Sequence, residues 1–261
     1  MSGYFESIPV DSLLGQIEAA GAEHLSLYGS EVRQVGPLRA IFAGPGLPVN
    51  VACGFGSSPD GLEKLLDSVE AFYILHGLPS RLVLYSHFGD WEALAARGYS
   101  LLRLLHVYAR LLTERPAPPP MPSPSQPPSR SQLTARPSLP AEFLSVASRA
   151  FGVGSEAIME RTAQRPQTQF FAAELGGQPV AAAAFSVFGS LALLFSAATL
   201  PAFRGQGAQT ALLAARLHAA HGAGVTVAAV MTTPGSASER NVQRTGFVLA
   251  GARLSMEQVR A

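Results

Sequence analysis

"FRGQGAQTALL", residues 203–213, places two glycines and an arginine directly before a run rich in alanine and leucine. Glycine lets a backbone approach a ligand closely because no Cβ stands in the way. The first turn of a helix presents unpaired amide groups and a partial positive charge, and both attract anions. The stretch therefore predicts a loop and a helix start that together hold a pyrophosphate. The residues expected at that site are Arg204, Gln206, Gly207, Ala208, Gln209 and Thr210.

The sequence on both sides of this loop predicts alternating strands and helices, from its hydrophobic periodicity and its turn residues. Before the loop we expect a first strand at 132–137, helices at 141–152 and 155–164, and strands at 168–175, 178–188 and 191–200. After the loop we expect a helix at 208–222, a strand at 225–233, a short helix at 236–245 and a final strand or hairpin from residue 246.

The segment from Leu175 to Phe203 contains no charged residue and is long enough to imitate a membrane-spanning helix. Gly189 and Ser190 interrupt it with a turn signal, and Val, Phe and Leu on either side form two runs of strand length. We therefore expect two adjacent buried strands in this segment and no membrane partner.

A proline-rich segment divides the chain. Ten of the 25 residues from Pro116 to Pro140 are proline, a composition that excludes helix and central strand and favours an extended connector. We expect a first domain over residues 1–115, a linker over 116–130 and a second domain over 131–261.

The first domain repeats the order of the second in outline. Its expected strands lie near 38–44, 49–56, 81–87 and 100–112, and its expected helices near 58–77 and 89–99. In both halves a short helix ends at a glycine followed by an aromatic residue, Gly98-Tyr99 and Gly246-Phe247, where the chain is expected to turn through a left-handed conformation. The pattern predicts an internal duplication of the fold, of class α+β with a mixed sheet of the α/β type.

Composition narrows the partners and the compartment. A net charge of +1 argues against binding to nucleic acid or to an anionic membrane. Residues 1–115 carry eight Lys and Arg against twelve Asp and Glu, whereas residues 141–261 carry nine Arg against six Glu, a balance that suits an anionic cofactor in the second half. The single cysteine, Cys53, allows no intrachain disulfide, so we expect a cytoplasmic protein. His218 and His221 have no partner at metal-ligand spacing, and no metal is expected.

Three kinds of ligand could supply the pyrophosphate. A nucleotide triphosphatase loop would need a lysine, and the chain has none after Lys64. A dinucleotide fold is a closer rival because Gly205, Gly207 and Thr210 nearly reproduce its Gly-x-Gly-x-x-Gly pattern, but no carboxylate follows in the strand at 225–233 to hold the ribose. Coenzyme A is the third ligand.

The loop resembles motif A of the GNAT superfamily of N-acetyltransferases, whose pattern is Gln/Arg-x-x-Gly-x-Gly/Ala. Arg204 and Gly207 match this pattern, and Gln209 departs from it. The segment SASERNVQRTGF, residues 236–247, is similar to the family's motif B, a short helix that ends in Gly-Phe. The match covers roughly residues 131–258. It implies two tandem GNAT-like domains, each with a central, mostly antiparallel twisted sheet flanked by helices, of which the first is degenerate.

The resemblance also implies acetyl-CoA as cosubstrate, with its pyrophosphate on residues 206–210. The backbone around Thr199 and Leu200 would pair with the pantetheine arm and polarise the thioester carbonyl. Ser238 matches a family position near that arm, and Asn241 lies one helical turn further on. We expect Ser238 both at the cofactor and, with Asn241, among the catalytic residues. Ser238 could equally serve only as part of the helix start.

The acid and base of the reaction are harder to place. Family members often use a tyrosine four residues before the glycine of Gly-Phe, where this chain has Val242, and all six tyrosines lie before residue 116. Glu174 is the nearest candidate base, although a carboxylate at a strand turn is more often simply solvated. The first half carries GFGSSPDGLEK, residues 54–64, at the place of the glycine loop, which is unfavourable for a pyrophosphate.

The leading hypothesis is an N-acyltransferase, most simply an acetyltransferase, that transfers an acyl group directly from acyl-CoA to a small-molecule amine in a ternary complex. A monomer or a homodimer is expected. One alternative is a non-catalytic module that binds or senses acyl-CoA, and a second is a dinucleotide-binding enzyme.

Overall fold

The computed structural model describes residues 10–113, 116 and 133–259, and its contacts divide the chain into two compact units. Unit 1 comprises residues 1–107, 232–234 and 249–261, and unit 2 comprises residues 108–231 and 235–248. Of the expected linker over 116–130, all but residue 116 lies outside the described residues. The domain boundaries expected from the sequence remain a prediction.

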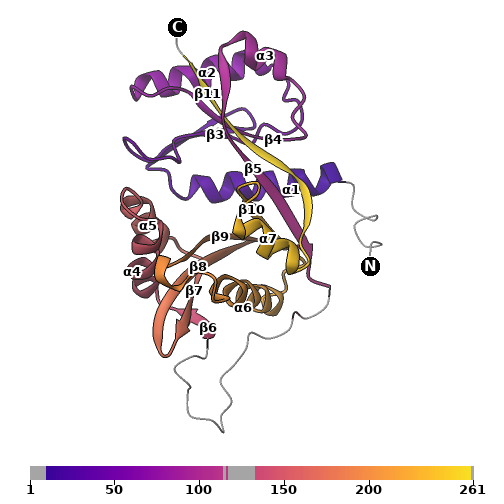
Figure 1. The fold of residues 1–261 in the computed structure, drawn as a ribbon. Helices are drawn as coiled ribbons and strands as arrows, with labels where there is room; N and C mark the ends of the chain where they lie inside the picture. Colours follow the sequence, from indigo (N-terminus) through magenta and orange to yellow (C-terminus); the bar gives the residue numbers. More distant parts are fainter. Residues whose placement is uncertain (1–9, 114–115, 117–132, 260–261) are drawn as a thin grey trace. The chain divides into compact units, whose positions relative to one another are not determined.

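Unit 2 contains a mixed sheet with the strand order β10-β9-β8-β7-β6 (Figure 1). Its strands are β6 (Leu133–Ser138), β7 (Thr168–Leu175), β8 (Gln178–Phe188), β9 (Leu191–Thr199) and β10 (Val227–Thr232). Strands β6 to β9 pair antiparallel and β10 pairs parallel with β9. Its helices are α4 (Pro140–Phe151), α5 (Glu156–Ala163), α6 (Ala208–Gly222) and α7 (Ala237–Arg244), with a short 3₁₀ turn at Pro201–Phe203. Each expected element of this half is therefore confirmed within a few residues.

The apolar run at 175–203 forms the centre of this sheet, with strands buried on both faces. On β8, Ala183 and Phe185 pack with α6, whereas their neighbours Ala182 and Ala184 pack with α4. Successive side chains of a strand point to opposite faces of the sheet. Because a helix covers each face here, both sets of side chains are apolar, and the sequence shows no alternation of apolar and polar residues. None of the helices in the described part of the chain combines the length and apolar character that crossing a membrane requires.

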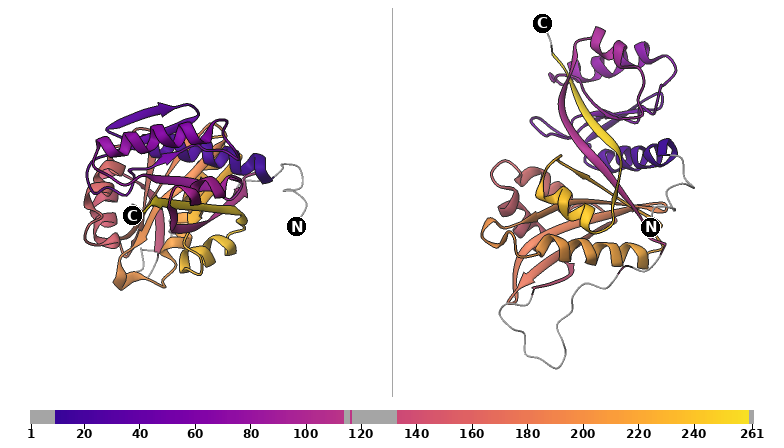
Figure 2. Two further views of the ribbon diagram at one scale, coloured as in Figure 1. Left: turned by 90° about the horizontal axis from the view of Figure 1, so that it is seen from above. Right: turned by 45° about the vertical axis from the view of Figure 1, so that its right-hand side comes forward.

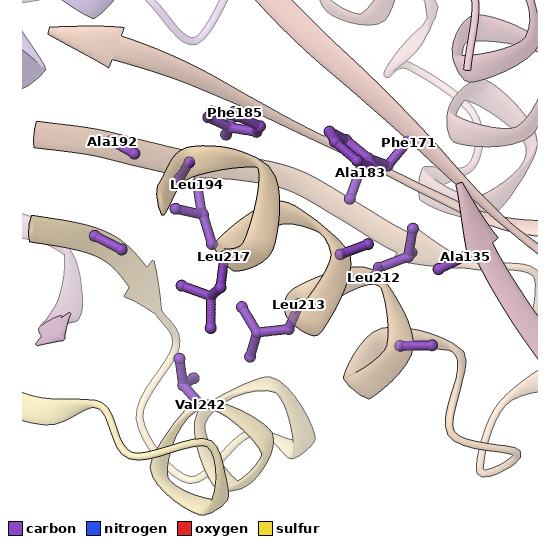
Figure 3. Packing of buried hydrophobic residues seen from close by; sticks show 14 of the residues in the cluster. Ala135, Phe171, Ala183, Phe185, Ala192, Leu194, Leu212, Leu213, Leu217 and Val242 are labelled. Carbon is purple, nitrogen blue, oxygen red and sulfur yellow. The ribbon is translucent and has the colours of Figure 1, made fainter. Parts of the chain in front are cut away.

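Helix α6 fixes the position of the glycine loop by packing on the sheet. Figure 3 shows Leu213 and Leu217 of α6 between Leu194 of β9 and Val242 of α7. All four side chains are almost completely buried. Burying a leucine side chain stabilises a fold by roughly 1.5–3 kcal/mol. This packing therefore fixes the position of α6 against the sheet, and with it the position of the first turn of α6.

Unit 1 is also built from paired strands and helices. Its elements are α1 (Val10–Ser26), β1 (Glu31–Val35), β2 (Leu38–Phe42), β3 (Ala52–Cys53), α2 (Leu62–Leu75), β4 (Arg81–Tyr85), α3 (Trp91–Ala96), the first part of β5 (Tyr99–Leu111) and β11 (Val248–Gln258). The strand order is β1-β2-β3-β4-β11, with β3 parallel to β4 and the other pairs antiparallel. Its core includes Leu66 and Phe72 of α2 against Leu82 and Leu84 of β4.

The last strand of the chain completes the sheet of the first half. Figure 2 shows β11, in yellow, among the elements of unit 1, and its residues 253–257 pair with β4 from Arg253↔Tyr85 to Glu257↔Arg81. The pairing is reinforced by an ion pair between the side chains of Arg81 and Glu257. A final strand was expected, but its partner strand lies far away in the sequence.

The expected turns at the two Gly-aromatic pairs are confirmed. Gly98 follows α3 with φ of 77°, and Gly246 follows α7 with φ of 81°, both in the left-handed region that favours glycine. Each is followed by a long strand, β5 and β11 respectively. Helix α1 and strand β1 were not expected from the sequence.

Candidate functional site

Strand β9 carries a β-bulge near its C-terminal end. Between residues 195 and 198, β9 contains one residue more than the facing segment 182–184 of β8. Ser196, inside this bulge, has φ of 49°, an uncommon value for a residue other than glycine. Bulges redirect a strand and are frequent next to functional sites.

Beyond the middle of β9, its edge toward β10 is open. The parallel pairing with β10 runs from Leu191 to Leu194, and in the described part of the chain no pairing continues past Leu194 on that side. The amide of Leu200 donates to the carbonyl of Val180 on β8 at 2.9 Å. Because backbone groups of successive strand residues point to opposite edges, the amide of Thr199 points to the open edge. This edge can pair with an extended ligand.

The glycine loop leads directly into α6 with two left-handed residues. Gly205 has φ of 78°, and Gly207, the N-cap of α6, has φ of 85°. A Cβ at Gly205 would meet no atom within 4 Å, and one at Gly207 would meet only Leu133 Cδ2, at 3.7 Å. The first turn of α6 has no side-chain cap and no acidic residue. Space and unpaired amides therefore coincide at this helix start.

The open edge, the loop and α7 line one cavity of about 680 Å³, which we call the α6 cavity. Its lining includes six residues expected from the sequence, Thr199, Arg204, Gly207, Gln209, Ser238 and Asn241. It also includes Arg240, Arg244 and Phe151. The volume is within the range of about 300–1,000 Å³ typical of small-molecule sites. Its lining contains three arginines and, among the described residues, no Asp or Glu. The α6 cavity is therefore suited to a ligand with several negative charges.

Two of the arginines are positioned by backbone carbonyls. Arg204 Nε donates to the carbonyl of Thr199 at 3.3 Å, and Arg240 Nη1 donates to that of Gly235 at 2.8 Å. A guanidinium has five N–H donors, so these contacts leave donors for a ligand.

Helix α7 is fixed at its start by two capping contacts that resemble a capping box but use the amide of the residue before the N-cap. Ser236 Oγ accepts from the amide of Glu239 at 3.1 Å, and Glu239 Oε2 accepts from the amide of Gly235 at 2.6 Å. This reciprocal pattern satisfies two amides at once. Asn241, on the next turn, donates from Nδ2 to Gln209 Oε1 at 3.2 Å and so ties α7 to the first turn of α6.

A buried tyrosine that is not part of the cavity lining contacts α7. Tyr108 of β5 belongs to unit 2, and its hydroxyl donates to Glu239 Oε1 at 3.1 Å and accepts from Gln243 Nε2 at 2.8 Å. Burial, together with the Glu239 carboxylate, raises the pKa of Tyr108. By its position in the sequence, Tyr108 belongs to the first half. No local signal joins it to Glu239, since the two lie 131 residues apart.

Glu174 lies outside the α6 cavity lining. It sits at the end of β7, where its carboxylate accepts from Arg136 Nε at 3.1 Å. Arg136 also holds Glu142, with Nη2 to Oε1 at 2.7 Å. An ion pair with a partly exposed arginine is the contact observed for this side chain, and its role as base remains a prediction.

The structure brings most of the sequence-predicted residues to the α6 cavity. Its lining includes Thr199, Arg204, Gly207, Ala208, Gln209, Thr210, Ser238 and Asn241. Leu200 is buried in the core with its amide used by β8, and Gln206 is not part of the lining. Val242, at the position where the family pattern has tyrosine, is 2% exposed. Within the described residues, no group of three or more His, Cys, Asp and Glu side chains could hold a metal ion.

The features of the cavity suit a ligand that combines a pyrophosphate with an extended chain. The glycine cradle at the start of α6 has space and amides for the pyrophosphate, and the arginines complement its charge. The open edge of β9 offers backbone groups to an extended chain that contains amides.

Several solved structures, some of them described as acetyltransferases, have a similar fold. A GCN5-related N-acetyltransferase from Kribbella flavida aligns with a TM-score of 0.71 at 15% identity, covering 95% of this chain and 96% of that one. One from Sphaerobacter thermophilus aligns with a TM-score of 0.60 at 16% identity, covering 80% and 72%. A tandem GNAT protein from the clavulanic acid biosynthesis pathway aligns with a TM-score of 0.60 at 15% identity, covering 86% and 79%. The fold is therefore that of the tandem GNAT proteins.

The family match lies where the cavity lies. Residues 140–247 match the model of the acetyltransferase (GNAT) family, a segment that contains the glycine loop, α6 and α7. This segment belongs to the GNAT family of acetyltransferases. No curated protein sequence matches the chain significantly.

Proposed function

We propose that this protein is an acyl-CoA-dependent N-acyltransferase that uses acetyl-CoA and acts on a small-molecule amine by direct transfer in a ternary complex. The observation that carries the proposal is the convergence of three features on the α6 cavity. They are the glycine cradle at Gly207, the opened edge of β9 at Thr199 and the three arginines of the lining.

Each feature has a separate task in this proposal. The amides of residues 207–210 and the Arg204 guanidinium bind the pyrophosphate. The amide of Thr199 pairs with the pantetheine arm. The backbone around Thr199 also polarises the thioester carbonyl, as donors fixed in advance stabilise developing negative charge. Ser238 and Asn241 border the arm from α7.

Acetyl-CoA supplies a thioester whose acyl carbon accepts the amine nitrogen while the carbon–sulfur bond breaks, its electron pair leaves on sulfur, and the nitrogen loses a proton to solvent. A thiol has a pKa of about 8.5, so the leaving sulfur can depart as thiolate near neutral pH. The chain's contribution is orientation and charge stabilisation, which together can account for a large part of a rate enhancement.

A second candidate is a module that binds acyl-CoA without turning it over. It is favoured by the chemistry of the lining, in which the described residues include no Asp, Glu, His, Lys, Cys or Tyr that could move a proton. Val242 favours the same candidate, since a valine side chain at that position cannot donate a proton.

One experiment separates the two candidates. Release of CoA is followed with a thiol reagent across a panel of small amines, and acetyl-CoA binding is measured by calorimetry on the same preparation. Turnover with at least one amine supports the transferase. Tight binding of acetyl-CoA without turnover on any amine favours the binding module. Binding of NAD(P) in preference to acetyl-CoA contradicts both.

The proposal also covers the cellular compartment of the protein and the role of unit 1. The single cysteine, Cys53, is buried, and burial raises the pKa of its thiol to about 12, so it is protonated and unreactive. These properties suit a cytoplasmic protein. Unit 1 has no sequence like RGQG, and in this proposal it binds no second coenzyme A.

A further inference from the structure

Helix α6 carries a charged side chain into the core of unit 2. Arg216 is 3% exposed, and burial lowers the pKa of its guanidinium to about 9, which is still above neutral pH, so the group is charged there. Among the described residues, no carboxylate forms an ion pair with it. A buried charge without a counterion destabilises a fold, so this arginine calls for an explanation.

The guanidinium of Arg216 bonds two backbone carbonyls. Nε donates to the carbonyl of Leu212, one turn earlier in α6, at 3.2 Å. Nη1 donates to the carbonyl of Ala184 on β8, also at 3.2 Å. The side chain therefore runs back along α6 toward the start of the helix and reaches the backbone of the sheet.

The carbonyl of Ala184 lies opposite the bulge of β9. The amide of Leu200 donates to the carbonyl of Val180 on β8, so the backbone groups of Val180 point to β9. The side chains of β8 alternate between the clusters on the two faces of the sheet without interruption, and the backbone groups of Ala184 therefore point to β9 as well. Ala184 pairs there with Phe195, at the start of the bulge. Arg216 thus bonds the sheet where the bulge interrupts the regular pairing.

The bulge contains a strained residue and directs the strand toward the cavity. Ser196 has φ of 49°, and a residue other than glycine keeps such a value only where the surrounding structure enforces it. The three residues that follow, 197–199, line the α6 cavity, whereas Arg216 does not. A change at the bulge would therefore change the direction of the segment that borders the ligand.

We propose that Arg216 is a positioning residue for the transfer reaction. Its guanidinium holds the carbonyl of Ala184, keeps the bulge at Ser196 in its strained form and so fixes residues 197–199 at the cavity. This inference rests on the proposed function. An apolar side chain of similar length would fill the same space without the cost of burying a charge, but only a donor can bond the carbonyl. The buried charge therefore contributes to the geometry of the site.

The test separates the pantetheine arm of CoA from its pyrophosphate. CoA and ADP, which contains the pyrophosphate but no arm, are titrated calorimetrically into the full chain. The proteins are the wild type, Arg216→Met, Ser196→Gly and the double variant. Methionine keeps much of the length of the side chain without its donors. Arg216→Lys keeps the charge and one donor group, and it replaces Arg216→Met throughout if circular dichroism shows that the methionine variant does not fold.

We expect Arg216→Met to bind CoA about 5- to 20-fold more weakly, as when a hydrogen bond of a charged group is lost, and to bind ADP to within about twofold of the wild type. Arg216→Lys should lose less CoA affinity. Ser196→Gly should bind CoA to within about twofold of the wild type, because glycine adopts a positive φ without strain. For the same reason, the double variant should bind CoA more tightly than Arg216→Met. A residue that only stabilised the core would affect CoA and ADP alike, whatever stands at position 196.

Three results overturn the inference while the wild type binds CoA. Unchanged CoA affinity in the variant at Arg216 means that the bulge does not depend on the arginine. Equal losses of CoA and ADP affinity mean that the substitution disturbs the whole cavity. A double variant no better than the single variant at Arg216 means that the effect does not pass through Ser196. A wild type that binds neither ligand overturns the proposed function itself, and this outcome is distinct from the other three.

Discussion

Asn241 Nδ2 donates to Gln209 Oε1 at 3.2 Å, and this bond joins the second turn of α7 to the first turn of α6. Gln209 stands where the family's loop pattern has glycine or alanine, and the structure shows the partner that its side chain uses. The bond connects the two helices that border the α6 cavity, the one expected at the pyrophosphate and the one expected at the arm.

Removal of either side chain of this pair is expected to weaken CoA binding. One hydrogen bond contributes about 0.5–1.5 kcal/mol, so Asn241→Ala and Gln209→Ala each lower affinity by about 2- to 10-fold. Because both act on one contact, the double variant loses about as much as a single one. Calorimetric titrations of the four proteins form the cycle. Fully additive losses would mean that the bond does not link the helices.

The glycine cradle predicts a charge effect at residue 207. Gly207→Asp places a carboxylate against the pyrophosphate and is expected to abolish CoA binding. Gly207→Asn has the same shape, tolerates the left-handed conformation similarly and carries no charge, so it is the control. The nearest atom to a Cβ there is Leu133 Cδ2 at an ordinary 3.7 Å, and both variants should fold.

Binding is measured by calorimetry and folding by circular dichroism. We expect the asparagine variant to bind CoA more weakly than the wild type and far more tightly than the aspartate variant. Equal affinity in the two variants would show that the charge at residue 207 does not meet the ligand.

The contact between Tyr108 and Glu239, neither of which lines the α6 cavity, predicts a loss of stability when the tyrosine hydroxyl is removed. Tyr108→Phe removes this donor from Oε1 of Glu239, a residue that is 7% exposed. We expect the free energy of unfolding to fall by about 1–3 kcal/mol. The KM for acetyl-CoA should rise, because Glu239 also caps α7 through Gly235. Urea unfolding and steady-state kinetics measure the two effects. Unchanged stability would show that the tyrosine hydroxyl does not support α7.

A buried carboxylate in unit 1 predicts a pH dependence of stability. Glu18 Oε2 lies 2.8 Å from His87 Nε2, and Glu18 Oε1 accepts from the amide of Gly56 at 3.1 Å. Burial raises the pKa of Glu18, against the opposing effects of the Gly56 amide and of His87. The folded chain therefore binds more protons than the unfolded chain between the two pKa values. The free energy of unfolding falls as the pH rises through that range.

Glu18→Gln cannot ionise and should not show this part of the fall. We expect the stability of the variant relative to wild type to increase from about pH 4 toward neutral pH, as the glutamate of the wild type ionises. Urea unfolding at several pH values measures the difference. A difference that is constant with pH, or that changes in the opposite direction, would contradict a raised pKa.

Much of unit 2 could be predicted because its signals are local. Helix α6 begins and ends at the residues expected from the alanine-rich run after Gly207. The turns at Gly98 and Gly246 follow from the φ values that glycine tolerates. The loop, the helix and the two hairpins together placed most of the expected cofactor residues at one cavity.

The rest depends on contacts between distant residues. Helix α1 contains Gly15 and Gly21, which lower helix propensity, and tertiary packing of residues such as Ile17 decides its structure. The pairing of β11 with β4 and the contact of Tyr108 with Glu239 each join segments more than a hundred residues apart. No periodicity along the chain reports such pairs.

The most direct test of the central claim is a calorimetric titration of the wild-type chain with acetyl-CoA. We expect saturable binding of one molecule per chain, since the glycine cradle and the three arginines of the cavity lining, among the described residues, lie in unit 2. Free CoA should compete with it, and NAD(P) should not. No binding of acetyl-CoA at millimolar concentration, or displacement of it by NAD(P), would contradict the assignment of the α6 cavity to coenzyme A.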